Sequence, residues 1–279
     1  MPRVLNESEI VDGWIVKYRD LLYWVVKGYS HPPGSLVAVP YRTSEGFRIR
    51  VESYKVFAQP WLMKWIDCIG REAPLLKISD IIRFYDPFVG YRLRAKELPD
   101  AIREFVDILN PEIVGLTGSW LLGFEKEDSD IDLLVYGDRD VYPTLVDLAL
   151  EGQITSCKRE TRLPRIFGFI LTDACFKGVR YTLRILRTVT NEGCKKTLIP
   201  IASYVGPIRI VDSSDSYRVP AKYSIVLERL GLKAVLETWH TRFMELATGK
   251  YHARLSLRAD TEKGPIIASP DLEGSIYVG

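Results

Sequence analysis

The sequence contains few of the residues that build disulfide frameworks and zinc sites. Its 279 residues include only four cysteines and three histidines, and no two cysteines form a C-x-x-C pair. This pattern argues against a structural zinc site. We therefore expect four free, half-buried thiols in a reducing compartment. The cysteines are Cys68, Cys157, Cys175 and Cys194.

Long apolar segments are also missing. The longest runs, Leu21 to Val26 and Ile166 to Leu171, are far too short to cross a hydrocarbon layer of about 30 Å. The N-terminal residues lack the apolar region and small-residue cleavage site of a secretory signal. We expect a cytoplasmic protein with no membrane partner.

Neither sign of charge dominates the chain. Its 38 lysines and arginines against 36 acidic residues leave a formal net charge of +2, which argues against a surface that is basic all over. The charge is unevenly placed, because residues 119–140 carry a net −5 and residues 157–187 a net +6. Opposite segments of this kind suit a cleft that binds phosphate, although two solvated faces that pair with each other would give the same pattern.

The apolar pattern divides the chain into four regions. Residues 1–58 alternate short β-rich runs with Pro and Gly turns and predict a small β module. Residues 59–95 have apolar positions at helical spacing after Pro60 and predict a helical connector. Residues 96–190 mix helical and strand patterns, and residues 191–279 return to β texture as a second β module.

The third region, the predicted core, has the clearest order of elements. An amphipathic helix is predicted from Leu98 to Leu109, where apolar residues repeat at i, i+3, i+4 and i+7. The segments that follow are a strand at 113–118, a short helix at 119–124, an acidic loop at 125–130, a strand at 131–137, a helix at 142–150, and two strands at 165–172 and 179–187 joined by a hairpin turn at 176–178.

The stretch from Gly118 to Asp132 carries the chemistry. Asp130 and Asp132 are two residues apart on a predicted strand, so their carboxylates project from one face about 7 Å apart along the chain. Carboxylates placed in this way can share Mg²⁺, which prefers oxygen ligands and retains phosphate oxygens. Gly118 allows close approach of the backbone and Ser119 offers a hydroxyl, which suits a triphosphate.

This segment resembles the signature of the polymerase-β-like nucleotidyltransferase superfamily, in which Gly-Ser is followed after ten residues by D-x-D. The resemblance spans about residues 96–190. It implies an α+β fold, with a nucleotidyltransferase core of mixed sheet and helices, flanked here by N- and C-terminal small β-barrel-like modules. It also implies transfer of a nucleotidyl group from a nucleoside triphosphate to a hydroxyl acceptor such as RNA, with Mg²⁺ or Mn²⁺ as cofactor.

The third carboxylate that this superfamily normally presents is not where the pattern requires it. The polar face of the candidate strand carries Arg180, Thr182 and Arg184. Arg184 can pair with Asp130 or Asp132 in a metal-free site, or Arg180 and Arg184 can bind triphosphate oxygens. Asp173 is the nearest replacement, reached only through a bulge or a shift of register. A two-metal site is therefore in doubt.

The flanking regions resemble, less specifically, a group of predicted archaeal nucleotidyltransferases with β-rich extensions, through VVKGYSHPPGSLVAVPYR near the N-terminus and residues 238–251. Exposed aromatic residues on small β modules can stack on nucleic-acid bases, whereas buried ones fill the core. The aromatic candidates are Trp14, Tyr23, Trp24, Tyr29, Tyr41 and Trp239.

Two functions remain open. The leading hypothesis is an Mg²⁺-dependent nucleotidyltransferase with Asp130 and Asp132 as catalytic metal ligands and Gly118, Ser119, Arg180 and Arg184 at the nucleotide. The alternative is a degenerate, noncatalytic nucleotidyltransferase fold that binds a nucleotide or RNA. Transfer of the nucleotidyl group to a protein is a third outcome that the sequence leaves open.

Overall fold

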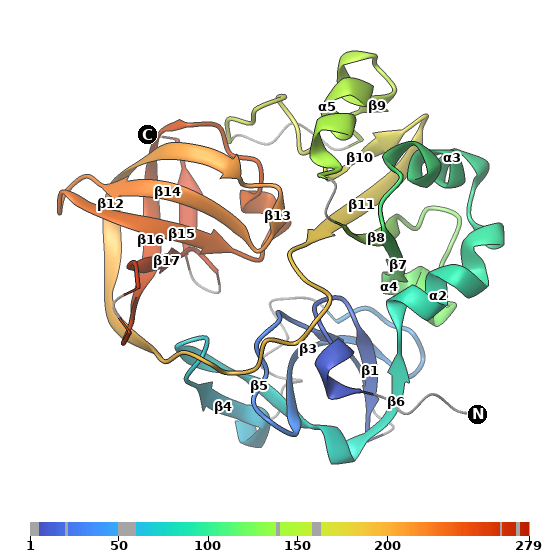
Figure 1. The fold of residues 1–279 in the computed structure, drawn as a ribbon, viewed down its shortest axis with the longest axis horizontal. Helices are drawn as coiled ribbons and strands as arrows, with labels where there is room; N and C mark the ends of the chain where they lie inside the picture. The colour runs from blue at the N-terminus through green and yellow to red at the C-terminus, as the bar shows by residue number, and fades with distance from the viewer. Residues whose placement is uncertain are drawn as a thin grey trace. The chain divides into compact units, whose positions relative to one another are not determined.

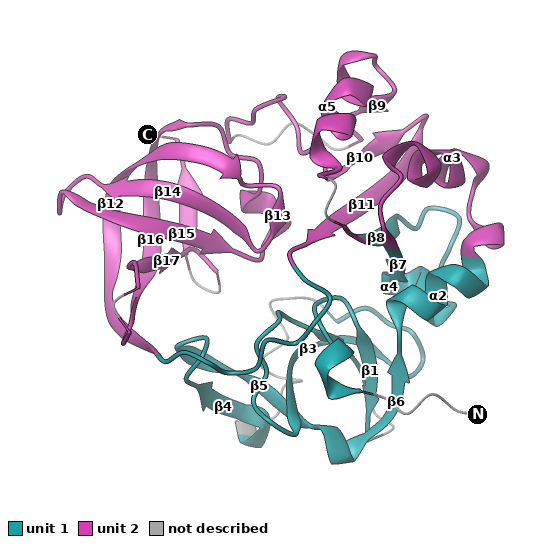
Figure 2. Cartoon of the chain, viewed as in Figure 1, with its two compact units in different colours: residues 1–94, 114–134, 188–197 teal, residues 95–113, 135–187, 198–279 magenta. Residues whose placement is uncertain are grey.

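A computed structural model describes residues 6–19, 22–49, 60–137, 140–157, 163–262, 264–271 and 274–278. The chain divides into two compact units (Figure 2). Unit 1 comprises residues 1–94, 114–134 and 188–197, and unit 2 comprises residues 95–113, 135–187 and 198–279. Strands and helices are mixed along the chain (Figure 1), which confirms the α+β class.

Unit 1 contains a six-stranded antiparallel sheet in the order β4-β5-β3-β2-β1-β6. Its indoles Trp14 and Trp24 are buried, as are most residues of its first two strands. The strands are β1 (Ile15–Tyr18), β2 (Leu22–Val26), β3 (Ser35–Thr43), β4 (Met63–Ile66), β5 (Arg71–Lys77) and β6 (Ile81–Tyr85), with short 3₁₀ turns η1 (Glu7–Glu9), η3 (Pro60–Leu62) and η4 (Ile78–Asp80).

The helical connector predicted for residues 59–95 is wrong for most of its described length. Three strands of that sheet, β4 to β6, occupy 63–85, and only α2 (Pro87–Arg94) is a helix. The apolar spacing that suggested a helix instead leaves Trp61 58% and Trp65 49% exposed. Gly70, at φ +61°, lies in the turn between β4 and β5, and pairing with β3 then outweighs the weak local preference for helix.

The predicted core forms a second sheet in the strand order β7-β8-β11-β10-β9, and β13 (Arg218–Val219) pairs with β11 in parallel. The helix predicted from Leu98 to Leu109 is confirmed as α3 (Asp100–Leu109), preceded by η5 (Ala95–Glu97), and Ile102, Phe105 and Leu109 are buried. The remaining elements are β7 (Ile113–Thr117), α4 (Gly118–Leu122), β8 (Ile131–Tyr136), α5 (Tyr142–Leu150), β9 (Ile154–Thr155), β10 (Asp173–Phe176) and β11 (Val179–Leu186).

The strand predicted at 165–172 is wrong. This segment forms turns, with Gly168 at φ +77°. The backbone N–H groups of Leu171 and Thr172 donate to the carboxylate of Glu245 at 2.7 and 3.0 Å rather than to a neighbouring strand. The guanidinium of Arg165 donates to the carbonyls of Arg242 and Met244. Side-chain hydrogen bonds thus replace the ladder that the apolar run predicted, whereas the hairpin turn at 176–178 is confirmed between β10 and β11.

The C-terminal residues of unit 2 form a sheet in the order β12-β14-β15-β17-β16-β18, and an additional β12–β16 pairing closes a circuit of strands. The alternation predicted for 251–259 is confirmed as far as Leu257, because Tyr251, Ala253, Leu255 and Leu257 are buried, but it ends at Arg258, which is buried as well. The strands are β12 (Leu198–Asp215), β14 (Ala221–Leu227), β15 (Leu232–Thr238), β16 (Gly249–Asp260), β17 (Ile267–Ser269) and β18 (Ser275–Tyr277), with one 3₁₀ turn, η6 (Thr241–Phe243).

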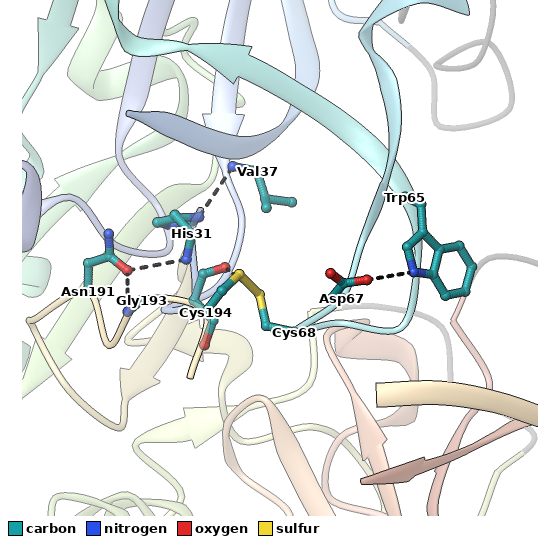
Figure 3. The surroundings of a disulfide bond; sticks show 9 residues. His31, Val37, Trp65, Asp67, Cys68, Asn191, Gly193 and Cys194 are labelled. Atoms are coloured by element: carbon teal, nitrogen blue, oxygen red, sulfur yellow. Dashed lines mark hydrogen bonds between the residues drawn. A yellow bond between two sulfur atoms is a disulfide. The ribbon is translucent and has the colours of Figure 1, made fainter. Parts of the chain in front are cut away.

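The cysteines are paired, so the prediction of four free thiols is wrong. Cys68 and Cys194 form a disulfide in unit 1 (Figure 3), with their Cα atoms 5.0 Å apart. Cys157 and Cys175 form another in unit 2, with their Cα atoms 5.5 Å apart. The two cysteines of the first pair are 126 positions apart in sequence and those of the second pair 18. The fold brings each pair together, so the spacing of the cysteines alone does not reveal the pairing.

His31 connects the sheet of unit 1 to the segment that carries Cys194 (Figure 3). Its backbone N–H donates to Oδ1 of Asn191 at 3.2 Å, and its Nδ1 accepts from the N–H of Val37 at 3.2 Å. Desolvation lowers the pKa of the His31 imidazole to about 4, although the charge of Asp12 opposes this shift. His31 is therefore neutral near pH 7. In the described residues, we find no helix with the length and apolar character needed to span a membrane.

Candidate functional site

Gly118 and Asp132 are in direct contact at the end of β7. Gly118 follows Thr117, whose Oγ1 donates to the carbonyl of Gly13 at 2.6 Å, and has φ +69°. A Cβ at position 118 would lie 1.9 Å from Oδ2 of Asp132 and 2.8 Å from its Cγ. Because a side chain would collide with the carboxylate and strain the backbone, this position requires glycine.

The short helix α4 holds the backbone after Gly118. Ser119 is 3% exposed, and its carbonyl accepts the N–H of Gly123, the C-cap at φ +74°, and the N–H of Phe124 at 3.0 Å. Gly123 therefore ends the helix in the left-handed conformation that glycine adopts easily. The result is a compact turn that fixes the chain between Gly118 and the acidic loop.

The acidic loop is held at two points. Ser129 Oγ accepts the N–H of Lys126 at 2.8 Å, and the N–H of Ser129 donates to the Lys126 carbonyl at 3.0 Å. Arg94 binds both carboxylate oxygens of Glu125, at 3.3 and 2.5 Å, which lowers the pKa of that carboxyl. Ser129 of the motif thus shapes the turn that leads into the aspartates.

Asp130 and Asp132 have the placement that the sequence predicts. Asp130 precedes β8 and Asp132 is its second residue; both are partly exposed, while Ile131 and Leu133 between and after them are buried. Alternation along an extended chain directs the two carboxylates to the same side. Asp132 and Gly118 therefore form one cluster within unit 1, and Asp130 lies two positions before Asp132 in the chain.

The N-terminal sheet contributes side chains that the motif analysis did not assign to this cluster. Tyr41 lies on β3, and burial, followed by the negative charge of Asp132, raises the pKa of its phenol. Tyr41 is therefore protonated at neutral pH. The guanidinium of Arg42 lies over the Tyr41 ring, 5.1 Å from its centroid. Arg42 and Arg48 lie on either side of Ser44-Glu45-Gly46 in the sequence. This pair of arginines is the sequence signal that could have pointed to a role of the N-terminal sheet at the site.

Most of the aromatic residues considered for base stacking fill the core instead. Trp14, Tyr23, Trp24 and Tyr29 are buried, whereas Tyr41 and Trp239 are partly buried. The exposed aromatic side chains of the described part of unit 1 are others, among them Phe47 at 72%. Packing in the core thus accounts for the four buried residues Trp14, Tyr23, Trp24 and Tyr29.

The predicted basic residues lie on β11 in unit 2. Arg180, Thr182 and Arg184 alternate with buried Tyr181 and Leu183, as the polar face requires. Asp173 lies on β10 directly opposite Thr182, with Oδ1 3.5 Å from the threonine Oγ1. It thus occupies a regular position in a strand and pairs in register. Lys158, Arg159 and Arg162 of the basic segment lie outside the described residues.

The carboxylates of Asp130 and Asp132 in unit 1 are the side chains considered for a metal ion. Across the described ranges, no group of three or more His, Cys, Asp or Glu side chains is arranged to hold a metal ion. Two carboxylates fit one Mg²⁺ that completes its shell with phosphate oxygens and water. They do not fit a second ion.

One comparison with known proteins gives a match. Residues 96–168 match the family model described as "Nucleotidyltransferase domain", consistent with the polymerase-β-like nucleotidyltransferase superfamily. The matched residues include α3, β7, α4, the acidic loop and β8. No curated protein and no solved structure matches the chain. The chain therefore carries a nucleotidyltransferase domain, which supports nucleotidyl transfer as its general function.

Proposed function

We propose that this protein transfers a nucleotidyl group from a nucleoside triphosphate to a hydroxyl acceptor, with RNA as the first acceptor to test. The acceptor oxygen attacks the α-phosphorus, the bond to the bridging oxygen breaks, and pyrophosphate leaves with that electron pair. The contact between Gly118 and Asp132 is the observation that supports this proposal most directly. It brings the Gly-Ser turn and the D-x-D strand of the matched domain to one place.

Asp130 and Asp132 would hold one Mg²⁺ or Mn²⁺ ion in this proposal, together with oxygens of the triphosphate. Such an ion supplies charge neutralisation and orientation of the transferred phosphate. Gly118 leaves room for the Asp132 carboxylate itself, and the α4 turn fixes Ser119. We keep Arg180 and Arg184, on the polar face of β11, as proposed ligands of the triphosphate.

A noncatalytic nucleotide- or RNA-binding protein is the second candidate. The polar face of β11 carries Arg180, Thr182 and Arg184 and no acid. Two carboxylates with one inward arginine would leave a site of about −1 before any ion binds, and with both arginines about 0. Either is too little negative charge for two divalent ions. This candidate predicts nucleotide binding without transfer.

Labelling distinguishes these functions. The protein is incubated with Mg²⁺, nucleoside triphosphates labelled at the α-phosphate, and total cellular RNA. We expect label on RNA with the parent and none with Asp130→Asn, because that variant loses a metal ligand but retains its shape. Asp128→Asn, an exposed acid of the same loop, is the matched control and should label RNA like the parent. Triphosphate binding without label on RNA favours the noncatalytic candidate. Label on a polypeptide would show that the acceptor is a protein and not RNA.

We keep residues 96–190 and 191–279 as a proposal for the domain organisation and join residues 59–95 to 1–58, because β5 pairs with β3 and β6 with β1. The closed circuit of pairings among β12, β14, β15, β17 and β16 supports a small barrel in the last region. A cytoplasmic location belongs to the same proposal. Fractionation of cells that express the tagged protein tests it, and recovery with membranes or in the medium would contradict it.

A further inference from the structure

Two arginines oppose each other where β3 of the N-terminal sheet ends. Arg42 and Arg48 are directly opposite in an antiparallel bridge, and the flanking N–H groups of Ile49 and Thr43 donate to the carbonyls of Tyr41 and Phe47 at 2.9 and 3.0 Å. Like charges directly opposite on antiparallel strands destabilise the pair. Throughout the described chain, no acidic side chain forms an ion pair with either arginine. An anion between them would remove this repulsion.

The guanidinium of Arg42 is already oriented. Its Nη1 donates to the carbonyl of Gly46 at 2.6 Å, and its plane lies near the Tyr41 ring. Its Nε is buried and has no hydrogen-bond partner in the described part of the chain. A buried donor without an acceptor is unfavourable, so a shift of the side chain that brings this N–H to a ligand oxygen would recover a hydrogen bond.

The turn between the two arginines packs against the motif itself. Gly46 has φ +88°, and a Cβ there would lie 2.9 Å from Cδ1 of Phe124. Phe124 in turn donates its N–H to the carbonyl of Ser119. Residues 41–49 therefore border the Gly118–Asp132 cluster, and all of these residues belong to unit 1.

We propose that Arg42 and Arg48 bind the triphosphate of the nucleotide, so that the N-terminal sheet supplies cationic side chains to the site. This inference rests on the proposed function. Each guanidinium presents five N–H donors in a fork that matches phosphate oxygens. A triphosphate fits better than the single charges of an RNA backbone, because adjacent phosphates can occupy both forks at once.

The test uses the full chain and inorganic tripolyphosphate without divalent metal, followed by isothermal titration. We expect Arg42→Gln and Arg48→Gln each to weaken binding about tenfold, the loss typical of one charge-assisted hydrogen bond, and the double variant to weaken it further. Arg254→Gln, an exposed arginine of β16 in unit 2, is the matched control and should bind like the parent. Full affinity in the double variant overturns the proposal.

Thermal unfolding separates binding from folding. Without phosphate, Arg48→Gln should unfold at the same temperature as the parent or higher, because it removes a like-charge contact. Tripolyphosphate should raise the midpoint of the parent but not that of the double variant. An oligoribonucleotide with a 5′-hydroxyl that binds the two arginines more tightly than tripolyphosphate would overturn the assignment to the triphosphate.

Asp132→Asn distinguishes this inference from the proposed function. That variant should lose the gain in nucleotide affinity that Mg²⁺ brings, yet keep or increase metal-free binding of tripolyphosphate. If it loses the Mg²⁺ gain while the double arginine variant keeps its tripolyphosphate affinity, the function stands and the inference is overturned. If the arginine variants lose tripolyphosphate while the parent shows no Mg²⁺ gain, the inference stands and the proposed function fails.

Discussion

Oδ2 of Asp132 occupies the space that a side chain at Gly118 would need. The two residues lie on different elements, β8 and the start of α4, and a Cβ at 118 would come within 1.9 Å of that oxygen. The Gly-Ser turn and the D-x-D strand are thus parts of one structure. A change at the glycine must therefore alter the carboxylate.

Gly118→Ala tests this contact against a closely matched control. Gly123→Ala also places a side chain at positive φ, but nothing lies within 4 Å of its Cβ. Gly123→Ala should therefore lower the free energy of unfolding by only about 1–2 kcal/mol, the strain of the left-handed conformation. Gly118→Ala should lower it further and should also abolish Mg²⁺-dependent nucleotide binding. Urea unfolding and titration measure both, and equal effects of the two variants would contradict the contact.

Acid should destabilise unit 1 through His31. Burial lowers the pKa of this imidazole from 6.5 to about 4, so the unfolded chain binds a proton that the folded chain excludes. Stability from this group is complete above about pH 6.5 and falls as the pH decreases towards 4, by up to about 3 kcal/mol. His31→Asn keeps an acceptor for the Val37 N–H but does not titrate.

Urea unfolding between pH 4 and 8 measures this effect. The profile of His31→Asn should be flatter than that of the parent over this range. His252→Gln, at a partly exposed position of β16, should keep the slope of the parent. Parallel profiles for His31→Asn and the parent would show that His31 is not the group responsible.

The two disulfides should differ in their contribution to stability. In the chain-entropy model, a disulfide raises the free energy of unfolding more when it closes a longer loop. The Cys68–Cys194 bond joins residues 126 positions apart and should contribute ~5 kcal/mol. The Cys157–Cys175 bond joins residues 18 positions apart and should contribute ~3 kcal/mol. Cys68→Ser should therefore lower the free energy of unfolding more than Cys157→Ser. Dithiothreitol should destabilise the parent and leave the variant that lacks all four cysteines unchanged. No effect of the reductant on the parent would mean that the thiols are free in solution.

Glu245 should be essential for the turns at 165–172. Burial raises the pKa of its carboxyl, whereas donation from the N–H groups of Leu171 and Thr172 and from Thr172 Oγ1 opposes this shift. Glu245→Gln replaces one carboxylate oxygen, an acceptor, with an NH₂ group, a donor. That donor would face the N–H and O–H donors of Leu171 and Thr172. We expect a loss of about 3 kcal/mol, within the range for breaking a buried charged network. Glu262→Gln, at an exposed position, should change unfolding by less than about 0.5 kcal/mol.

Residues 98–137 were predictable because local preference and tertiary packing agree there. The apolar repeat of α3 buries Ile102 and Phe105, and the alternation around Asp132 persists in β8. At 59–95 they disagree. Trp61, Trp65 and Ile69 have helical spacing, but β5 pairs with β3 and β6 with β1, both far away in sequence. Segment 165–172 failed because Glu245, more than seventy residues later, accepts its N–H groups.

The site shows the same division. The assignment of Gly118, Asp130 and Asp132 to one site depends on spacing within a short stretch and stays a prediction, of which the structure shows the contact between Gly118 and Asp132. Arg42 and Arg48 were not assigned, because only the fold of unit 1 packs their hairpin against Phe124. The disulfides were missed for the same reason, since sequence distance says nothing about which cysteines meet.

The most direct test of the central claim is titration of nucleoside triphosphates into the parent and into Asp132→Asn, with and without Mg²⁺. The account predicts that Mg²⁺ increases the affinity of the parent at least tenfold, that Asp132→Asn shows no such increase, and that Asp128→Asn behaves like the parent. An equal Mg²⁺ effect in the parent and in Asp132→Asn, or none in the parent, would contradict it.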